Sequence, residues 1–261
     1  MAKITCDFFS EALTLNTSMT VFLPEQTHTQ FGMQNHKRAN TLHPTLYLLH
    51  GFSDDHSIWS RRTSIERYVA ELGLAVVMPD VDHSFYTDMV YGKKYWTFLT
   101  EELPQVARSF FPLSDRREDN FVAGLSMGGY GAFKWALNKP EQFAAAASLS
   151  GVLDLAKHPQ NSANNDPMAQ TLYNVFGGED IHGTMHDIFH LVRELNQMTG
   201  PKPELYQACG TEDFLFEENL AFKELTDQLS VNIKTVFDPG THEWGYWDYH
   251  IQEVLKWLPL K

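Results

Sequence analysis

The sequence predicts an α/β fold: a mostly parallel central sheet with an N-terminal antiparallel hairpin and helices on both faces. Two observations predict it. Short uninterrupted apolar runs, typical of strands buried on both faces, alternate along the chain with segments of helical apolar spacing. Ahead of them lies a stretch in which apolar residues recur at every second position, as in a half-exposed strand. With 261 residues and 43% hydrophobic content, the chain can bury a full core, and we expect a single domain over residues 1–261.

The N-terminal hairpin is predicted from residues 4–9 and 13–23. In the second segment Leu13, Leu15, Met19, Val21 and Leu23 all fall at odd positions, the spacing of two that a strand requires. Residues 25–43 are polar and show no period, so we expect a surface loop there.

The later elements alternate between strand and helix. Pro104 falls inside one helical pattern, where it either kinks the helix or starts a second one. Residues 152–203 fit the alternation poorly and are expected to form an insertion over the carboxyl-terminal edge of the sheet. We expect strands at 45–49, 74–78, 121–123, 143–149, 205–209 and 231–237, and helices at 65–72, 94–111, 130–137, 217–229 and 246–258.

Charge and composition exclude several classes of protein. The formal net charge is −13, which argues against binding to nucleic acid or to an anionic membrane surface. The first residues carry no apolar segment of the signal-peptide type, and no run reaches 18 apolar residues, so we expect neither export nor a membrane span. Cys6 and Cys209 lie far apart in the chain and are expected to be reduced thiols. A cytoplasmic location is therefore expected.

Residues 124–128 read Gly-Leu-Ser-Met-Gly, a match to the pattern G-x-S-x-G. The apolar run 121–123 precedes the match and a helical pattern follows it, which is the context of a nucleophile on a sharp strand-to-helix turn. Such a turn exposes the Ser126 hydroxyl at the edge of the sheet, beside the positive end of a helix. The alternative is a glycine-rich turn in which Ser126 only caps the helix.

Two later loops supply partners for a nucleophilic serine. Asp213 follows the predicted strand 205–209, and His242 follows the predicted strand 231–237, so both reach the same sheet edge as Ser126. The order serine, acid, histidine is that of the α/β-hydrolases. We expect His242 to act as the general base and Asp213 to orient it, with Glu212 and Asp238 as the alternative acids.

Backbone N–H groups are expected to stabilise the developing oxyanion. The predicted donors are Met127, next to the nucleophile, and Phe52, in the loop after strand 45–49. Aromatic side chains near these loops are expected to line a substrate pocket, although each is also a candidate for plain core. These residues are Trp59, Phe85, Tyr86, Phe176, Phe214 and Trp244.

No metal or other cofactor is expected. His242-Glu243 lacks a second histidine four residues on, so a zinc protease motif is excluded. His182, His186 and His190 recur every four residues, a spacing that would place three imidazoles on one helical face. Acidic or thiol partners at matching positions are missing from this pattern, so a polar face is the favoured interpretation.

Several motifs together are similar to those of one family. They read Tyr-Leu-Leu-His-Gly at 47–51, Glu-Leu-Pro-Gln at 102–105, Ala-Gly-Leu-Ser-Met-Gly-Gly-Tyr-Gly at 123–131, Gly-Thr-Glu-Asp-Phe-Leu at 210–215 and Gly-Thr-His-Glu-Trp at 240–244. The chain resembles the small tributyrin esterases, in the esterase D, S-formylglutathione hydrolase-like branch of the α/β-hydrolases. The resemblance implies the α/β-hydrolase fold and a serine carboxylesterase that hydrolyses short-chain acyl esters without a cofactor. It also implies a triad of Ser126, Asp213 and His242.

Three alternatives stay open. S-formylglutathione hydrolases usually have histidine where this chain has Leu125, and cysteine within the loop that here reads Phe52-Ser53-Asp54. Acetyl or feruloyl esterase activity on carbohydrates is also similar to what relatives do. A non-catalytic α/β-hydrolase-fold binding protein is the distant alternative, since such proteins usually lose a triad residue. The expected partner is a small-molecule ester, and a homo-oligomer is left open.

Overall fold

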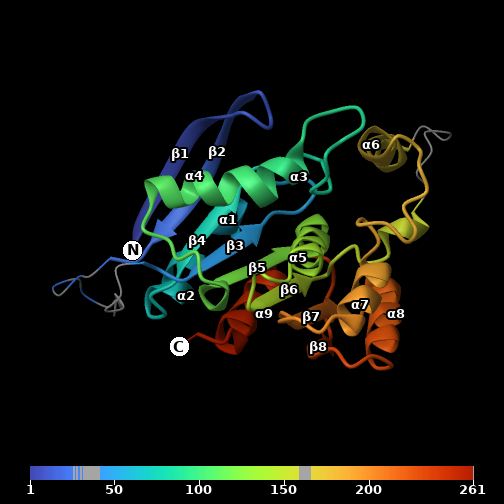
Figure 1. Ribbon diagram of the computed structural model, residues 1–261. Helices are drawn as coiled ribbons and strands as arrows, with labels where there is room; N and C mark the ends of the chain where they lie inside the picture. The colour runs from blue at the N-terminus through green and yellow to red at the C-terminus, as the bar shows by residue number, and fades with distance from the viewer. Residues whose placement is uncertain (26, 28, 30, 32–41, 159–165, 261) are drawn as a thin grey trace.

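The computed structural model describes residues 1–25, 27, 29, 31, 42–158 and 166–260. Across these ranges eight strands form one sheet, in the order β1-β2-β4-β3-β5-β6-β7-β8 (Figure 1). The predicted loop at 25–43 lies largely outside the described residues. The strands are β1 (Ala2–Ser10), β2 (Leu15–Leu23), β3 (Thr45–Leu49), β4 (Ala75–Pro79), β5 (Asn120–Leu125), β6 (Ala145–Leu149), β7 (Glu204–Gly210) and β8 (Ile233–Asp238).

Strand direction follows the prediction. β1 and β2 form the expected hairpin, in register from Ala2 opposite Leu23 to Ser10 opposite Leu15. β2 also pairs antiparallel with β4, and every pairing from β4 to β8 is parallel. β3, β4, β5 and β6 are buried along their whole length, which is why their sequences read as uninterrupted apolar runs. The predicted α/β fold class is confirmed.

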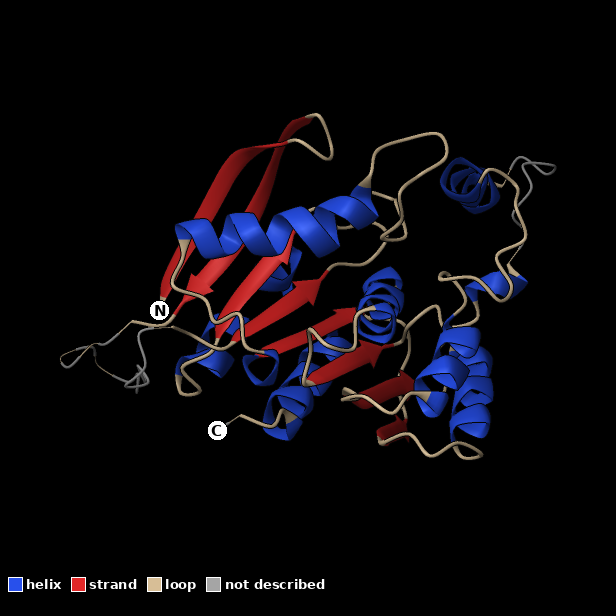
Figure 2. Ribbon diagram, viewed as in Figure 1, coloured by secondary structure: helices blue, strands red, loops and turns tan. Residues whose placement is uncertain are grey.

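Helices cover both faces of the sheet (Figure 2). Alternate side chains of each strand enter different cores: Leu46 and Leu48 pack on one side, Tyr47 and Leu49 on the other. The first side is covered by α1 (Ile58–Arg62), α2 (Ile65–Ala70) and α9 (Trp244–Trp257). The second is covered by α3 (Tyr95–Thr97), a π-helical segment (Phe98–Glu102), α4 (Leu103–Phe110), α5 (Met127–Asn138), α7 (Ile188–Gln197) and α8 (Phe216–Thr226).

The helix predicted at 94–111 is divided into three segments. Pro104 lies just after the π-helical segment, and the backbone before it is helical (Glu102 φ −78°, ψ −51°), so it falls inside one continuous helix and does not mark a second start. A π-helical segment joins α3 to α4 and ends at Glu102. The Glu102 carboxylate accepts hydrogen bonds from Ser10 Oγ at 2.5 Å and from the backbone N–H of Glu11 at 2.7 Å. This carboxylate therefore fixes the turn of the β1–β2 hairpin against the helix.

Residues 152–203, predicted as an insertion, contain a 3₁₀ turn (Leu155–Lys157), α6 (Pro167–Phe176) and α7. Figure 1 shows α6 beside the loop that follows β4. Two backbone hydrogen bonds join them: Val90 N–H to Val175 O at 3.0 Å and Tyr91 N–H to Asn174 O at 2.9 Å. α7 instead packs against α5 and α8. The two helices of this segment thus contact different parts of the fold.

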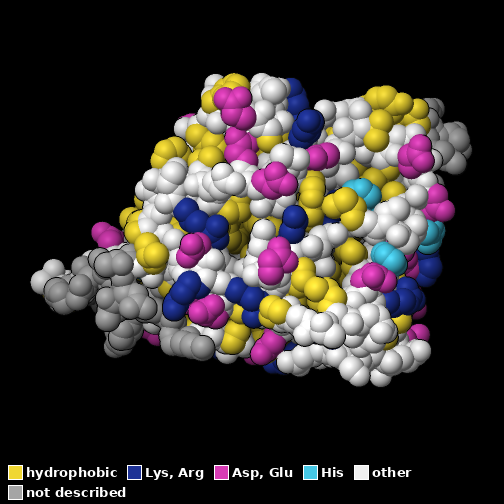
Figure 3. All heavy atoms as spheres, in the orientation of Figure 1, with side chains coloured by type: hydrophobic (Ala, Val, Ile, Leu, Met, Phe, Trp, Pro, Cys, Tyr) yellow, Lys and Arg dark blue, Asp and Glu magenta, His cyan; other side chains and the backbone are white. Residues whose placement is uncertain are grey.

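Charged side chains of both signs are mixed on one face of the molecule (Figure 3). On the face shown in Figure 3, Lys and Arg are interspersed with Asp and Glu. Within the described residues, no helix is long and apolar enough to cross a membrane.

Candidate active site

Ser126 occupies a strained turn between β5 and α5. Its φ of 52° and ψ of −119° lie in a region that residues other than glycine rarely adopt. Glycines allow the strand and the helix to approach each other this closely. A β-carbon at Gly124 would collide with the Gly128 carbonyl, and one at Gly128 would lie 2.5 Å from Leu49 O. The predicted strand–turn–helix geometry is therefore present, with its serine at the carboxyl end of β5.

A continuous chain of hydrogen bonds links three side chains from the loops after β5, β7 and β8. Ser126 Oγ lies 3.0 Å from His242 Nε2. His242 Nδ1 lies 2.9 Å from Asp213 Oδ2 and 3.1 Å from Asp213 Oδ1. The Asp213 side chain is 0% exposed and the His242 side chain 18%. Hydroxyl, imidazole and carboxylate in this order can activate the hydroxyl as a nucleophile.

The Asp213 carboxylate is held in its charged form. Burial raises its pKa, but hydrogen bonds from His242 and from the Leu215 backbone N–H, at 2.9 Å, outweigh burial and bring the pKa below the ordinary value. A charged, buried carboxylate beside Nδ1 stabilises an imidazolium.

The two alternative acids point elsewhere. Glu212 is exposed and accepts hydrogen bonds from the Gly240 N–H at 2.7 Å and the Thr211 hydroxyl at 2.8 Å. Asp238 pairs with His250, with 3.1 Å between Oδ1 and Nε2. Of the three predicted acids, only Asp213 has a hydrogen bond to His242 in the described structure.

Ser150 is a site residue that sequence reasoning missed. It follows β6 at the same sheet edge, is fully buried and has a φ of 47°. Its hydroxyl accepts a hydrogen bond from Trp247 Nε1 at 3.1 Å and also bonds to Asp213, lowering the pKa of that carboxyl. The Trp247 ring in turn packs edge-on against the His242 ring, 4.8 Å between centroids. The available signal was the Ser150-Gly151 pair directly after the β6 strand.

The predicted oxyanion donors come from two segments that lie close to Ser126. Met127 is the first residue of α5, so its N–H has no carbonyl one turn earlier in the helix. Phe52 follows Gly51, where a β-carbon would lie 3.8 Å from the Ser126 β-carbon. The loop after β3 therefore passes directly beside the serine.

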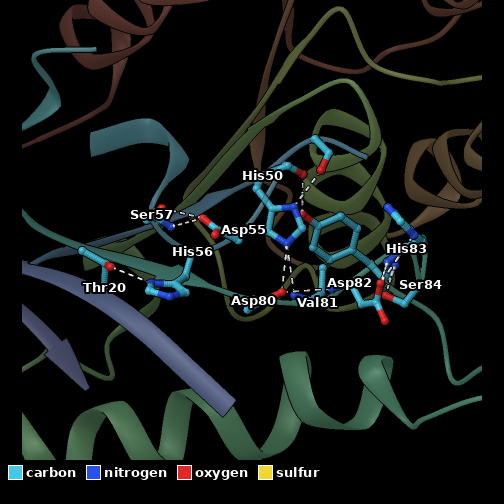
Figure 4. A network of polar contacts seen from close by, with 12 residues as sticks. Thr20, His50, Asp55, His56, Ser57, Asp80, Val81, Asp82, His83 and Ser84 are labelled. Carbon is cyan, nitrogen blue, oxygen red and sulfur yellow. Dashed lines mark hydrogen bonds and ion pairs between the residues drawn. The ribbon is translucent and has the colours of Figure 1, made fainter. Parts of the chain in front are cut away.

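A buried histidine fixes the shape of that loop. His50 Nδ1 donates to Gly51 O at 2.7 Å, and its Nε2 accepts the Val81 N–H at 3.0 Å. Figure 4 shows the His50 ring directed at the turn formed by Asp80 and Val81. Burial lowers the pKa of His50, in agreement with a neutral ring that accepts at Nε2. His50 thus ties the loop after β3 to the loop after β4.

The six predicted pocket aromatics do not form one wall. Trp59 and Trp244 pack edge-on against each other in the core on the α9 side of the sheet. Phe85, Tyr86 and Phe176 are buried on the opposite side. Phe214 is 75% exposed, and its ring lies 4.5 Å from the His242 ring, centroid to centroid. Lining of the substrate pocket by these residues stays a prediction.

The histidines at spacing four do not share a helical face. α7 begins at Ile188, so His182 and His186 lie in the turns before it and only His190 lies in the helix. His182 is exposed and pairs with Asp180 at 2.6 Å, while burial and the Lys134 charge lower the pKa of His186 to about 3. Among the described residues, no three His, Cys, Asp or Glu side chains are grouped to hold a metal ion.

Comparison with known proteins identifies the family. Residues 10–258 match the family described as "Putative esterase". An acetyl esterase from Caldicellulosiruptor saccharolyticus is 31% identical over 263 residues, covering 99% of this chain and 98% of that protein. The chain belongs to this esterase family.

Similar solved structures agree with the assignment of this chain to the esterase family. FphF, a fluorophosphonate-binding serine hydrolase of Staphylococcus aureus, is 35% identical, with a TM-score of 0.86 and 98% of each chain covered. The S-formylglutathione hydrolase FrmB of the same organism is also 35% identical, with a TM-score of 0.83 and 98% of each chain covered. These similarities confirm the α/β-hydrolase fold and the predicted place in the esterase D-like branch. The esterase is therefore an enzyme of the serine hydrolase class.

Proposed function

We propose that the esterase hydrolyses short-chain acyl esters through an acyl-enzyme intermediate on Ser126. The observation that carries the proposal is the chain of hydrogen bonds from Ser126 Oγ through His242 to Asp213, at 3.0 Å and 2.9 Å. These hydrogen bonds lie at the edge of the sheet where a strained turn presents Ser126. The acetyl esterase relative also supports a short acyl group.

In the first half-reaction Ser126 Oγ attacks the ester carbonyl carbon, and its proton passes to His242 Nε2. The tetrahedral intermediate carries its negative charge on the former carbonyl oxygen. When that intermediate collapses, the bond from carbon to the alcohol oxygen breaks and His242 returns the proton to the departing alcohol. Asp213 stabilises the imidazolium that exists between these two transfers.

In the second half-reaction a water molecule attacks the acyl carbon and gives a proton to His242 Nε2. The second tetrahedral intermediate releases the carboxylic acid, and the proton returns to Ser126 Oγ. Both intermediates place an oxyanion where the Phe52 and Met127 N–H groups can donate to it. Removing one such donor lowers kcat by about 10²–10³ in serine proteases.

A preference for short acyl groups follows if aromatic rings close the acyl side. The Phe52 ring, on the residue that carries a proposed oxyanion donor, lies 5.9 Å from the Phe85 ring, centroid to centroid. Each buried methylene gains about 0.8 kcal/mol, whereas one forced against a packed ring costs about 1–3 kcal/mol. We therefore expect rates to rise from acetyl to about butyryl and to fall steeply by octanoyl.

The second candidate function is hydrolysis of S-formylglutathione, which the similarity to FrmB favours. Charge argues against it. The net charge of −13 would repel the carboxylates of a glutathione moiety at long range. Hydrolysis of acetyl or feruloyl esters of carbohydrates is a further alternative to the proposed activity.

We also propose a cytoplasmic location. In the described part of the chain, both Cys6 and Cys209 are free thiols, as is usual for proteins in a reducing compartment.

The test is a comparison of kcat/KM for p-nitrophenyl acetate, butyrate and octanoate with kcat/KM for S-formylglutathione, under identical conditions. The proposal predicts a maximum near butyrate and a lower value for the thioester. A flat profile to octanoate would contradict the closed acyl side. A marked preference for S-formylglutathione would establish the second candidate instead.

A further inference from the structure

Lys134 is 0% exposed, although it carries an ammonium group and lies on helix α5 directly behind the proposed nucleophile. Its Nζ donates to Thr87 Oγ1 at 2.6 Å, to Tyr86 O at 2.8 Å and to Phe85 O at 3.5 Å. Three acceptors match the three donors of an ammonium group. Burial of a lysine is rare and disfavours the charged form, and it lowers the pKa of Lys134 well below its ordinary value.

Two aromatic rings complete the surroundings of this ammonium group. Nζ lies 5.0 Å from the centroid of the Trp96 ring and 5.5 Å from that of Tyr130. Both distances are within the range of cation–π attraction. The side chain is therefore held in one place by acceptors on one side and ring faces around it.

The segment that Lys134 binds is strained. Phe85 has a φ of 47° and Tyr86 a φ of 53°, two consecutive left-handed residues that are not glycine. This backbone conformation is unfavourable for side chains with a β-carbon. The carbonyl groups of these same two residues are the ones that accept from Nζ. The hydrogen bonds of Lys134 therefore stabilise the turn at 85–87 in its strained form.

The turn at 85–87 contacts the loop that carries the proposed oxyanion donor. The Tyr86 hydroxyl donates to His50 O at 2.8 Å, and the Phe85 ring lies 5.9 Å from the Phe52 ring, centroid to centroid. The Tyr86 ring also lies on α5, so close that a β-carbon at Gly131 would collide with it. Displacement of the turn would release the His50 carbonyl and move the ring that packs against Phe52.

Lys134 and Met127 lie seven residues apart on α5, which places them on one face two turns apart. One helix thus carries the proposed donor Met127 and anchors the turn that packs against the other donor, Phe52. We propose that Lys134 is a positioning residue: through the 85–87 turn it fixes the Phe52 N–H relative to the Met127 N–H. This inference rests on the proposed function.

The test compares Lys134→Met with wild type. The linear methionine side chain fills much of the space but donates no hydrogen bond. Because the oxyanion exists only in the transition state and the intermediates, we expect kcat to fall about ten- to a hundredfold, with KM changed less than about threefold. Binding of a trifluoromethyl ketone, which forms an oxyanion on the serine, should weaken by a similar factor.

A double-mutant cycle tests the route of the effect. Tyr86→Phe removes only the hydroxyl that donates to His50 O, and we expect it to lower kcat on its own. If Lys134 acts through Tyr86, the double variant should lose less than the product of the two single losses. A strictly multiplicative loss would overturn the proposed route, and the cycle can be run with Lys134→Gln if Lys134→Met does not fold.

The matched control is Phe133→Leu, a buried change on α5 whose ring packs against Phe222 on α8. It is expected to lower the melting temperature without lowering kcat. If Lys134→Met and Tyr86→Phe have the kcat of wild type while Ser126→Ala is inactive, the role of Lys134 is overturned and the proposed function stands. Activity in Ser126→Ala would instead overturn the proposed function.

Discussion

Asp213→Asn changes a single atom of the buried carboxylate, and the surrounding hydrogen bonds decide where that atom goes. The Leu215 backbone N–H donates to Oδ1 at 2.9 Å, so the asparagine oxygen is expected to take this position. The amide nitrogen then replaces Oδ2, which lies 2.9 Å from His242 Nδ1. An amide N–H facing Nδ1 forces the imidazole proton onto Nε2. In that tautomer His242 cannot accept the proton of Ser126.

The loss of charge gives the size of the effect. At 2.9 Å between His242 Nδ1 and Asp213 Oδ2, a pair of unit charges gains about 6 kcal/mol at an effective dielectric constant of about 20. This attraction exists only while His242 is protonated, which is in the transition state. At about 1.4 kcal/mol per factor of ten, kcat should fall about 10⁴-fold. The corresponding substitution in serine proteases lowers kcat by a similar factor.

The assay is steady-state hydrolysis of p-nitrophenyl butyrate by purified Asp213→Asn, with circular dichroism to verify folding. KM should stay within a few-fold of wild type, because Asp213 does not contact the substrate in the proposed mechanism. Asp238→Asn is the matched control, since that carboxylate pairs with His250. A nearly silent Asp213→Asn together with a crippled Asp238→Asn would refute the assignment of the acid.

Three further predictions follow from the same geometry. Gly128→Ala places a β-carbon 2.5 Å from Leu49 O, so it should destabilise the fold by about 1–3 kcal/mol and lower kcat. Gly200→Ala is the control, because a β-carbon there meets nothing within 4 Å and should change neither quantity. Urea unfolding measures the stability and steady-state kinetics measure kcat. Burial raises the pKa of Asp213, but its hydrogen bonds lower the pKa by a larger amount, so the net shift is downward. The charged carboxylate therefore stabilises the fold at a pH above the ordinary carboxyl pKa of 3.8. This stabilisation is lost as the pH falls through the lowered pKa. Asp213→Asn should therefore lose less stability than wild type as the pH falls below the ordinary carboxyl pKa of 3.8. EDTA should leave the rate unchanged, and a loss restored by zinc would contradict a mechanism built on side chains and backbone alone.

Periodicity was enough to predict the sheet, and the G-x-S-x-G match between a strand and a helix predicted the turn that presents Ser126. The strands β3 to β6 are buried on both faces, so their apolar runs follow directly from their surroundings. Asp213 and His242 could be assigned because parallel strands all end at one edge, and the residues after β7 and β8 must therefore meet Ser126. Their hydrogen bonds agree with that expectation.

The helices between β6 and β7 were missed although both carry local signals. Asp166 caps α6 and Pro167 starts it, and Asp187 caps α7 by accepting from the His190 N–H at 3.1 Å. The histidine spacing drew attention to residues before α7, while the apolar stripe of that helix begins at Ile188. A side-chain spacing shows which residues share a face only when they all lie in one helix, and the histidine spacing extends across the start of α7.

Supporting residues of the site could not be found from local pattern. Ser150 is important because its hydroxyl meets Trp247 of α9, and Lys134 because its amine meets a turn that follows β4. In the sequence Lys134 interrupts an otherwise apolar helix and resembles any exposed lysine. Its burial depends on how α5 and the 85–87 turn pack in three dimensions, which neither segment determines alone.

The most direct test of the central claim is intact-protein and peptide mass spectrometry after brief reaction with p-nitrophenyl acetate and, in parallel, with a fluorophosphonate. The account predicts one acetyl group or one phosphonyl group per chain, both on the peptide that contains Ser126, and no adduct in Ser126→Ala. An adduct on another residue, or turnover by Ser126→Ala at a tenth of the wild-type rate or more, would contradict Ser126 as the nucleophile.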